Sequence, residues 1–181
     1  MIQRTALVTG ASSGIGKEIA INLANQNITV CINFSKSKDL AGEVLKIIEN
    51  LGGKAVLFQA DVSKEQEVKR LFDFLGSEFQ SLDILVNNAG IYIPEYIEEH
   101  NVSTWERIID VNLKAKFLCT QHAIPLLRRS NSPRIINIAS RAAVKPFEES
   151  AAYCSAASGI VMLTKVSALE LAKYNIKVNT V

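Results

Sequence analysis

The sequence predicts an open α/β domain in which helices cover both faces of a parallel sheet. Three observations lead to this fold class. Short runs rich in β-branched residues alternate with longer stretches of helical periodicity. The order is strand and then helix throughout, which is typical of repeated βα units in a doubly wound sheet. A turn with glycine at positions 10, 14 and 16 separates the first strand from the first helix.

The first half of the chain contains three βα units. Strands are expected at residues 5–9, 28–34 and 54–59, and the helices that follow them at residues 14–25, 38–50 and 64–79. The glycine pair at 52 and 53 is a stop signal for the second helix. Apolar residues with helical spacing, such as Val68 and Leu75, give the third helix one buried face.

The second half begins with a strand at residues 83–86 and a loop from 87 to 99. Ser103 is expected to cap a long helix that runs to about residue 129, with Glu106 completing a capping box. Pro125 predicts a kink or an early end in that helix. A strand at 134–139, a helix at 151–174 and a strand at 176–181 complete the pattern. No linker interrupts it, so residues 1–181 are expected to form a single domain.

Composition excludes several classes of protein. The 20 Lys and Arg residues nearly balance the 18 Asp and Glu residues, so electrostatics favours neither nucleic acid nor an anionic membrane as a partner. The three cysteines form no CxxC pair and are expected to be reduced thiols in a cytoplasmic protein. No secretory leader, no apolar stretch near the roughly 20 residues of a membrane span and no metal site at His100 or His122 are expected.

The glycine-rich turn is the first candidate binding site. It reads Gly10-Ala11-Ser12-Ser13-Gly14-Ile15-Gly16. Glycine permits a positive φ and close approach of a ligand, and the N-terminus of the next helix offers unpaired N–H groups to a pyrophosphate. A tight βα turn without a ligand is the alternative. The spacing resembles TGxxxGxG of the short-chain dehydrogenase/reductase family, which has a Rossmann-like fold.

Three further segments resemble the family in the expected order. Asp61-Val62 corresponds to the pair that contacts the adenine ring, Asn87-Asn88-Ala89-Gly90 to the NNAG segment, and Asn112 to the helix asparagine. The resemblance covers essentially the whole chain. It implies that the cofactor contacts are Gly10, Ser12, Ser13, Gly14, Ile15, Gly16, Ser35, Lys36, Asp61, Val62, Asn88, Ala89, Gly90 and Tyr153.

The end of the second strand bears on the choice of cofactor. Relatives that prefer NAD place an acidic residue there, which holds the ribose hydroxyls and repels a 2′-phosphate. Here Phe34 occupies that position, and Ser35-Lys36-Ser37-Lys38 follow it. Lysine and serine can bind a phosphate. NADP(H) is therefore the expected cofactor, with NAD(H) as the alternative if these lysines only begin a solvated helix.

The family resemblance also implies the catalytic residues. Tyr153 would exchange a proton with the substrate oxygen, Ser140 would hydrogen-bond that oxygen, and Asn112 would anchor a water in a proton relay. The family motif is YxxxK, in which the lysine holds the nicotinamide ribose and lowers the pKa of the tyrosine. This chain has Ala157 in place of that lysine.

The missing lysine predicts weakened chemistry. Residues i and i+4 share a helix face, so position 157 is where an ammonium would meet the phenol. Lys165 lies about 18 Å from Tyr153 along the helix, too far to replace that lysine. Lys145 lies in the loop before Tyr153 and would have to move to reach the phenol. About one free tyrosine in a thousand is ionised at pH 7. Because carbonyl reduction uses the neutral phenol and alcohol oxidation needs the phenolate, remaining activity is expected to favour reduction.

Alternative functions remain open. Several segments resemble 3-oxoacyl-[acyl-carrier-protein] reductases of fatty-acid synthesis, although relatives that act on sugars, steroids and small alcohols look much alike. The chain could instead be a non-catalytic dinucleotide-binding protein, or Ala157 could be an introduced change. The resemblance further implies a homodimer or homotetramer through the fourth and fifth helices. Family members continue beyond residue 181 into a substrate lid and a last strand, so the domain is expected to be C-terminally incomplete.

Overall fold

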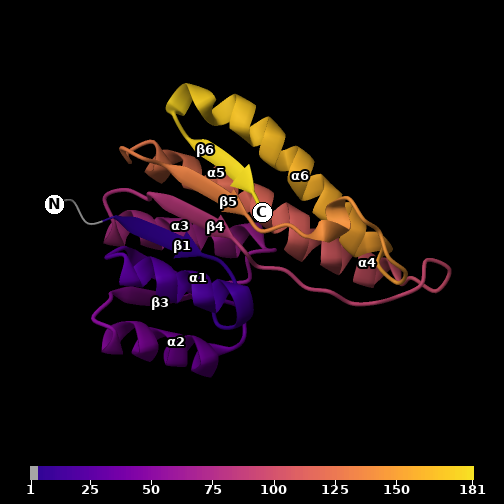
Figure 1. Ribbon diagram of the computed structural model, residues 1–181, viewed down its shortest axis with the longest axis horizontal. Coiled ribbons are helices and arrows are strands. Elements are labelled where there is room, and N and C mark those ends of the chain that lie inside the picture. Colours follow the sequence, from indigo (N-terminus) through magenta and orange to yellow (C-terminus); the bar gives the residue numbers. More distant parts are fainter. Residues whose placement is uncertain (1–3) are drawn as a thin grey trace.

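The computed structural model describes residues 4–181 and contains one six-stranded parallel sheet (Figure 1). The strand order is β3-β2-β1-β4-β5-β6, which confirms the doubly wound arrangement. The strands are β1 (Thr5–Val8), β2 (Thr29–Phe34), β3 (Ala55–Gln59), β4 (Ile84–Asn87), β5 (Arg134–Asn137) and β6 (Lys177–Thr180). All neighbours pair in parallel, so the carboxyl ends of the strands meet at one edge of the sheet.

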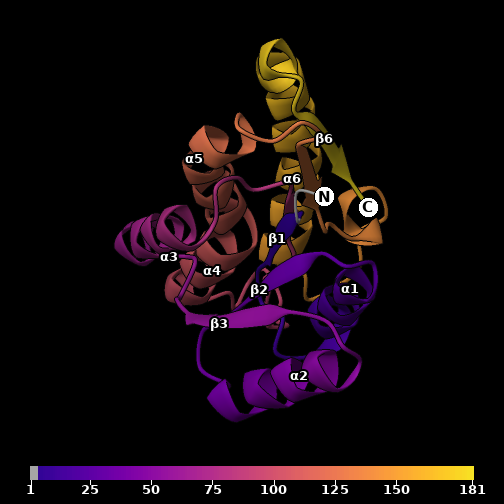
Figure 2. The ribbon, with the colours of Figure 1, turned by 90° about the vertical axis from the view of Figure 1, so that its left-hand side faces the viewer.

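The helices divide between the two faces (Figure 2). They are α1 (Gly14–Asn25), α2 (Lys38–Asn50), α3 (Glu65–Glu78), α4 (Val102–Ile109), α5 (Ala115–Leu127) and α6 (Ala151–Leu171). Ala20 of α1 and Val44 of α2 pack with Val8 and Ile32 of the sheet in one core. On the other face, residues of α3, α5 and the end of α6 form a second core with Leu7, Leu85 and Ile135. Parallel strands buried on both faces explain the continuous apolar runs in the sequence.

The long helix after β4 differs most from the sequence prediction. Asn101, and not Ser103, caps it, because the Asn101 Oδ1 accepts a hydrogen bond from the Ser103 amide at 3.0 Å. The helix is also divided into α4 and α5 by a π-helical turn, η1 (Asp110–Lys114). α5 contains Pro125 and ends shortly after it, at Leu127. The capping prediction was therefore wrong, whereas the early end after Pro125 is confirmed.

The other predicted elements are present, with ends that shift by a few residues. β1 ends at Val8 and β5 at Asn137, earlier than expected, because pairing with the neighbouring strands stops there. α6 ends at Leu171 and continues as a 3₁₀ turn, Ala172–Tyr174. β6 lies at one edge of the sheet, beside β5.

One sequence expectation about apolar length was wrong. The segment Ala151–Tyr174 is long and apolar enough, by length and composition, to cross a membrane. It is the single helix of this kind within residues 4–181. Part of α6 is buried, including Ala152, Ile160 and Leu171, while Met162 and Leu169 are exposed. Core helices of globular domains can be equally long and apolar.

Candidate active site

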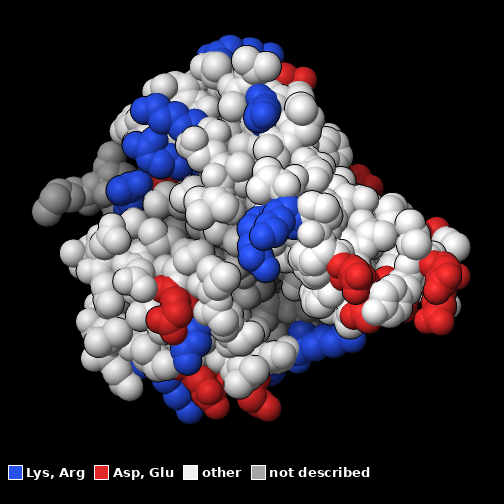
Figure 3. All heavy atoms as spheres, turned by 45° about the vertical axis from the view of Figure 1, so that its right-hand side comes forward, with Lys and Arg blue, Asp and Glu red and all other residues white. Residues whose placement is uncertain are grey.

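Two adjoining cavities open at the carboxyl edge of the sheet, on the face shown in Figure 3. The first, here called the turn cavity, has a volume of about 500 Å³ and lies beside the glycine-rich turn. The second, the tyrosine cavity, has a volume of about 260 Å³ and contains Tyr153 and Ser140. Ile15, Asn88 and Gly90 line both cavities, so the two form one continuous groove.

The glycine-rich turn has the conformation that its sequence predicts. Gly10 and Gly14 have φ values of 62° and 55°, a region that favours glycine. A Cβ atom at Gly16 would lie 2.5 Å from Asn88 Nδ2 and 2.6 Å from the Gly10 oxygen. The side-chain Nδ2 of Asn88 donates hydrogen bonds to the backbone oxygens of Thr9 and Gly10 at 3.0 and 3.1 Å. Asn88 therefore fixes the turn, and Gly16 allows α1 to begin against it.

The end of β2 carries no acidic group toward the turn cavity. Phe34 is its last residue and is 3% exposed, so its side chain is part of the core. Ser35, Lys36 and Ser37 follow and line the cavity. Asn33 closes its inner wall, since Asn33 Oδ1 accepts a hydrogen bond from the Gly10 amide at 3.3 Å. This end of the cavity thus offers hydroxyls and one ammonium group.

Asp61 also lines the turn cavity, and its carboxylate already has partners within the protein. Its Oδ1 accepts hydrogen bonds from the Ser63 hydroxyl and amide, and its Oδ2 pairs with Arg107 at 3.4 Å. Partial burial acts to raise the pKa of Asp61, but the Ser63 hydrogen bonds and the charges of Arg107 and Lys64 outweigh it and hold the pKa below its ordinary value. Asp61 is therefore a carboxylate at neutral pH, with Val62 beside it in the cavity wall.

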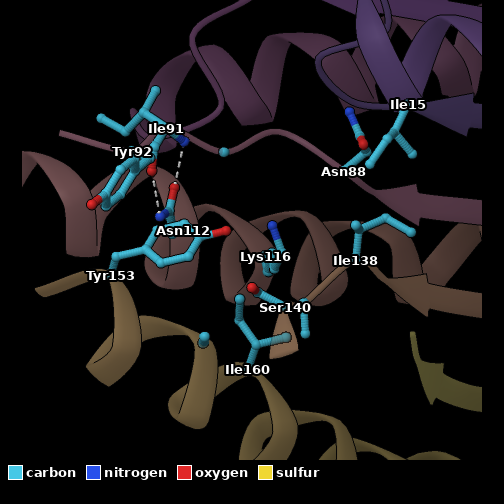
Figure 4. A pocket seen from close by; sticks show the side chains of 13 residues that line it. Ile15, Asn88, Ile91, Tyr92, Asn112, Lys116, Ile138, Ser140, Tyr153 and Ile160 are labelled. Carbon is cyan, nitrogen blue, oxygen red and sulfur yellow. Dashed lines mark hydrogen bonds between the residues drawn. The ribbon is translucent and has the colours of Figure 1, made fainter. Parts of the chain in front are cut away.

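The tyrosine cavity brings together the three predicted catalytic residues (Figure 4). Tyr153 comes from the first turn of α6, and its ring lies edge-on to Tyr92 with centroids 5.2 Å apart. Ser140 follows β5, and its Oγ accepts a hydrogen bond from the Ala142 amide at 3.1 Å. That bond leaves the Ser140 proton free to be donated.

Asn112 lies in the π-helical turn η1, and both ends of its side-chain amide bind the backbone of Ile91. Its Oδ1 accepts from the Ile91 amide at 2.7 Å, and its Nδ2 donates to the Ile91 oxygen at 2.8 Å. These two bonds hold the loop after β4 against the helix. π-Helical turns occur often at functional sites, where they displace a helical residue toward a ligand.

Ala157, at the position of the family lysine, forms an apolar part of the wall of the tyrosine cavity. Ala157 is 3% exposed and lines the tyrosine cavity one helical turn after Tyr153. Neither Lys145 nor Lys165 lines that cavity.

The structure also reveals a cavity residue that is not among those expected from the sequence. Lys116, on α5, lines the tyrosine cavity and is 3% exposed. Burial lowers its pKa from 10.5 to about 8. A signal was present, because Lys116 lies four residues after Asn112 and helical residues at that spacing share a face. Arg107 and Tyr92 were missed as well, and only the fold brings them to the groove.

Most predicted cofactor residues line the groove. Those in one or both cavities are Gly10, Ser12, Ser13, Ile15, Ser35, Lys36, Asp61, Val62, Asn88, Ala89, Gly90 and Tyr153. Gly14 and Gly16 line neither cavity and act instead on the shape of the turn and on the approach of α1.

Comparison with known proteins identifies the family. The family model described as short chain dehydrogenase matches residues 4–181. The chain belongs to the short-chain dehydrogenase family. A 3-oxoacyl-[acyl-carrier-protein] reductase of Staphylococcus epidermidis is 39% identical over 180 residues, which are 99% of this chain and 74% of that protein. The corresponding Synechocystis reductase is 39% identical and is covered to 72%.

Solved structures support the same assignment. A short-chain dehydrogenase/reductase variant from Serratia marcescens superposes with a TM-score of 0.94 and 33% identity, over 99% of this chain and 73% of that one. An acetoin dehydrogenase from Enterobacter cloacae gives a TM-score of 0.93 and 31% identity, over 99% of this chain and 71% of that one. This short-chain dehydrogenase is thus a nicotinamide-dinucleotide-dependent oxidoreductase by its family, and it spans roughly three quarters of the length of these relatives.

The residues of the groove fit a nicotinamide dinucleotide. The N-terminus of α1, which begins at Gly14, carries a partial positive charge beside the turn cavity, and Ser12 and Ser13 line the cavity there. The groove then continues past Asn88 and Gly90 to Tyr153. An elongated ligand with a pyrophosphate at the turn would therefore reach the tyrosine cavity with its far end.

Proposed function

We propose that this short-chain dehydrogenase is an NADP(H)-dependent carbonyl reductase in which Tyr153 is the proton donor. The observation that carries the proposal is the continuous groove from the glycine-rich turn to Tyr153 and Ser140. A dinucleotide bound at the turn would supply a hydride to the carbonyl carbon.

The protein residues would act on the carbonyl oxygen. The Ser140 hydroxyl, whose oxygen already accepts the Ala142 amide, would donate a hydrogen bond to that oxygen. The Tyr153 O–H bond would break as its proton passes to the same oxygen, which yields the alcohol and leaves a phenolate. Asn112 would keep the wall formed by Ile91 in place beside them. General acid catalysis of this kind contributes about 10²–10⁴-fold to a rate.

Ala157 supports the proposal that the reaction favours reduction. A methyl group at position 157 gives no positive charge to stabilise a phenolate before catalysis begins. Alcohol oxidation requires that phenolate as its base, whereas reduction starts from the neutral phenol. We therefore propose weak oxidation of alcohols and slower turnover than in a relative with the complete YxxxK motif.

The preference for NADP(H) is supported by the chemistry at the end of β2. Phe34 is buried and the cavity wall there consists of Ser35, Lys36 and Ser37. No carboxylate at this end would repel a 2′-phosphate, and Lys36 supplies a positive charge.

The proposed substrate is a 3-oxoacyl thioester, carried on acyl-carrier protein. Support comes from relatives that are 3-oxoacyl-[acyl-carrier-protein] reductases by name, such as the one from Staphylococcus epidermidis. A cytoplasmic location is proposed with it, because Cys31 and Cys119 are buried free thiols in this structure.

One observation favours a second candidate, a dinucleotide-binding protein without catalytic activity. The helix α6 retains Tyr153 but has Ala157 where its family has lysine. Such a protein would bind NADPH and transform no substrate.

The two candidates are separated by NADPH oxidation with a panel of ketones and 3-oxoacyl thioesters, before and after Ala157→Lys. A reductase turns over at least one substrate, and the added lysine increases its rate. A binding protein holds NADPH tightly in both forms and oxidises it in neither.

A further inference from the structure

Lys116 is unusual among the buried side chains of this protein. Within residues 4–181, it and Asp83 are the two charged residues in the buried set. Asp83 is satisfied by the Thr5 amide at 2.7 Å and by the Ser130 hydroxyl at 2.5 Å. Lys116 makes one hydrogen bond to the described residues, from Nζ to the Ala89 oxygen at 2.8 Å. An ammonium group has three protons, so this partner leaves most of its hydrogen-bonding capacity unused.

The ammonium of Lys116 is directed toward the groove and not into the core. In Figure 4 the Lys116 nitrogen, the Tyr153 hydroxyl and the Ser140 hydroxyl point into the same cavity. Lys116 is the one side chain with a formal charge among the described residues that line it. The titratable groups that line the cavity with it are Tyr92 from the loop after β4 and Tyr153 from α6. Cys119 lies close by on α5.

The two helices that line this cavity contribute side chains of different length, a short one from α6 and a long one from α5. On α6, position 157 is an alanine that lines the cavity. A longer side chain at this position would occupy part of the cavity beside Tyr153. α5 contributes the long side chain of Lys116 to the same cavity. A charge near the phenol is thus available from the opposite helix, although the family motif is absent.

We propose that Lys116 is a positioning residue for proton transfer from Tyr153, and that it supplies from α5 the positive charge that position 157 of α6 lacks. This inference rests on the proposed function. When the Tyr153 O–H bond breaks and the proton moves to the substrate oxygen, negative charge develops on the phenol oxygen. The Lys116 ammonium stabilises that charge in a cavity from which water is partly excluded, where electrostatic interactions are strong.

The protonation of Lys116 supports this role near neutral pH. Because its pKa is about 8, Lys116 is mostly charged at pH 7 and loses its proton as the pH rises through 8. Burial raises the pKa of the Cys119 thiol to about 12, so this neighbour stays neutral over the same range. A purely structural lysine, whose task is to bind the Ala89 oxygen, would keep that hydrogen bond in either protonation state.

A double-mutant cycle tests the inference. Four proteins are compared for NADPH-dependent reduction: the wild type, Lys116→Met, Ala157→Lys and the double variant. We expect Lys116→Met to lower kcat at least about tenfold with little change in KM, since methionine keeps the length but not the charge. We expect Ala157→Lys to raise kcat at least about tenfold more in the Lys116→Met background than in the wild type. Lys114→Met is the matched control, because Lys114 pairs with Asp110 at the surface.

The pH profile gives a second kinetic readout. The wild type should lose reductase activity as the pH rises through about 8, and Lys116→Met should lack that loss. Equal kcat in the wild type and Lys116→Met, additive effects in the cycle or an unchanged pH profile would overturn the inference.

A spectroscopic readout keeps the test decisive if no substrate turns over. The chain has 4 tyrosines, so tyrosine labelled with ¹³C at Cζ gives a small set of NMR signals, and Tyr153→Phe identifies the one of interest. In the wild type that signal should shift as the pH rises through about 8, when Lys116 loses its charge beside the phenol, and Lys116→Met should lack this shift. A shift without turnover would contradict the proposed function and support the inference. No shift would overturn the inference whether or not the protein turns over.

Discussion

The buried ammonium group of Lys116 lowers the stability of the folded protein at neutral pH. The side chain of Lys116 is 3% exposed, and its one hydrogen-bond partner among the described residues is the Ala89 oxygen. A pKa of about 8 in the folded chain, against 10.5 for the ordinary side chain, means that the folded state disfavours the charged form. The charged form is therefore a cost to folding at neutral pH.

The stability of Lys116→Met should reveal this cost through its pH dependence. Between pH 8 and 10.5 the unfolded wild type binds more protons than the folded state, so folding of the wild type becomes more favourable as the pH rises. Methionine has no such titration. From about pH 7 to about pH 9.5, the wild type should gain about 2 kcal/mol of unfolding free energy relative to the variant. Urea denaturation at both pH values measures it, and parallel changes in the two proteins would contradict a buried charge.

Lys36 is the residue on which the proposed preference for NADP(H) depends most directly. It lines the turn cavity, whereas Lys38 is exposed at the start of α2 and does not line it. Lys36→Glu should weaken NADPH binding about tenfold or more and change NADH binding little, because a carboxylate would repel a 2′-phosphate. Fluorescence titration with both dinucleotides gives the two Kd values.

Lys38→Glu is the matched control for Lys36→Glu and makes the same change in net charge. If it weakens NADPH binding as much as Lys36→Glu does, the effect is long-range and the proposed phosphate contact is wrong.

At the scale of elements, the junction between the glycine-rich turn and α1 is the least tolerant part of the fold. Gly16 lies where a Cβ would overlap Asn88 and the Gly10 backbone. Gly16→Ala should destabilise the protein by about 1–3 kcal/mol and weaken dinucleotide binding, since the start of α1 must move. Gly42→Ala in α2 meets no atom within 4 Å and should stabilise by up to about 1 kcal/mol. Thermal unfolding measures the stability change of both variants. Equal changes would show that a Cβ at position 16 does not clash with Asn88 and the Gly10 backbone.

Most helices and strands could be predicted from the sequence, but some of their ends and one turn could not. Strong periodicity and glycine stop signals placed the strands and most helices correctly, because local patterns carry that information. The Asn101 cap could not be chosen over Ser103 from spacing alone, since both residue types cap helices. The π-helical turn at Asp110–Lys114 depends on the Asn112 bonds to Ile91, which only the fold brings together. The spacing of Lys116 from Asn112 indicated a shared face, but it did not show that the ammonium is buried against the Ala89 oxygen, which only the fold brings to α5.

At the scale of the whole molecule, α5 and α6 expose apolar side chains. Phe117 is 46% exposed, Met162 58% and Leu169 80%. We expect this surface to be covered by a second copy of the chain, in a homodimer or homotetramer. Leu169→Lys together with Phe117→Lys should shift the protein to monomers in size-exclusion chromatography with light scattering. A wild type that is already monomeric at micromolar concentration would contradict the expectation.

We propose that the groove supports carbonyl reduction with Tyr153 as the acid. The most direct measurement is the steady-state rate of NADPH oxidation with a 3-oxoacyl thioester, for the wild type and for Tyr153→Phe. Phenylalanine preserves the edge-on packing against Tyr92 and removes the proton. We predict measurable turnover in the wild type and a loss of about 100-fold or more in Tyr153→Phe, with the Kd for NADPH nearly unchanged. Equal rates in the two proteins would contradict the claim.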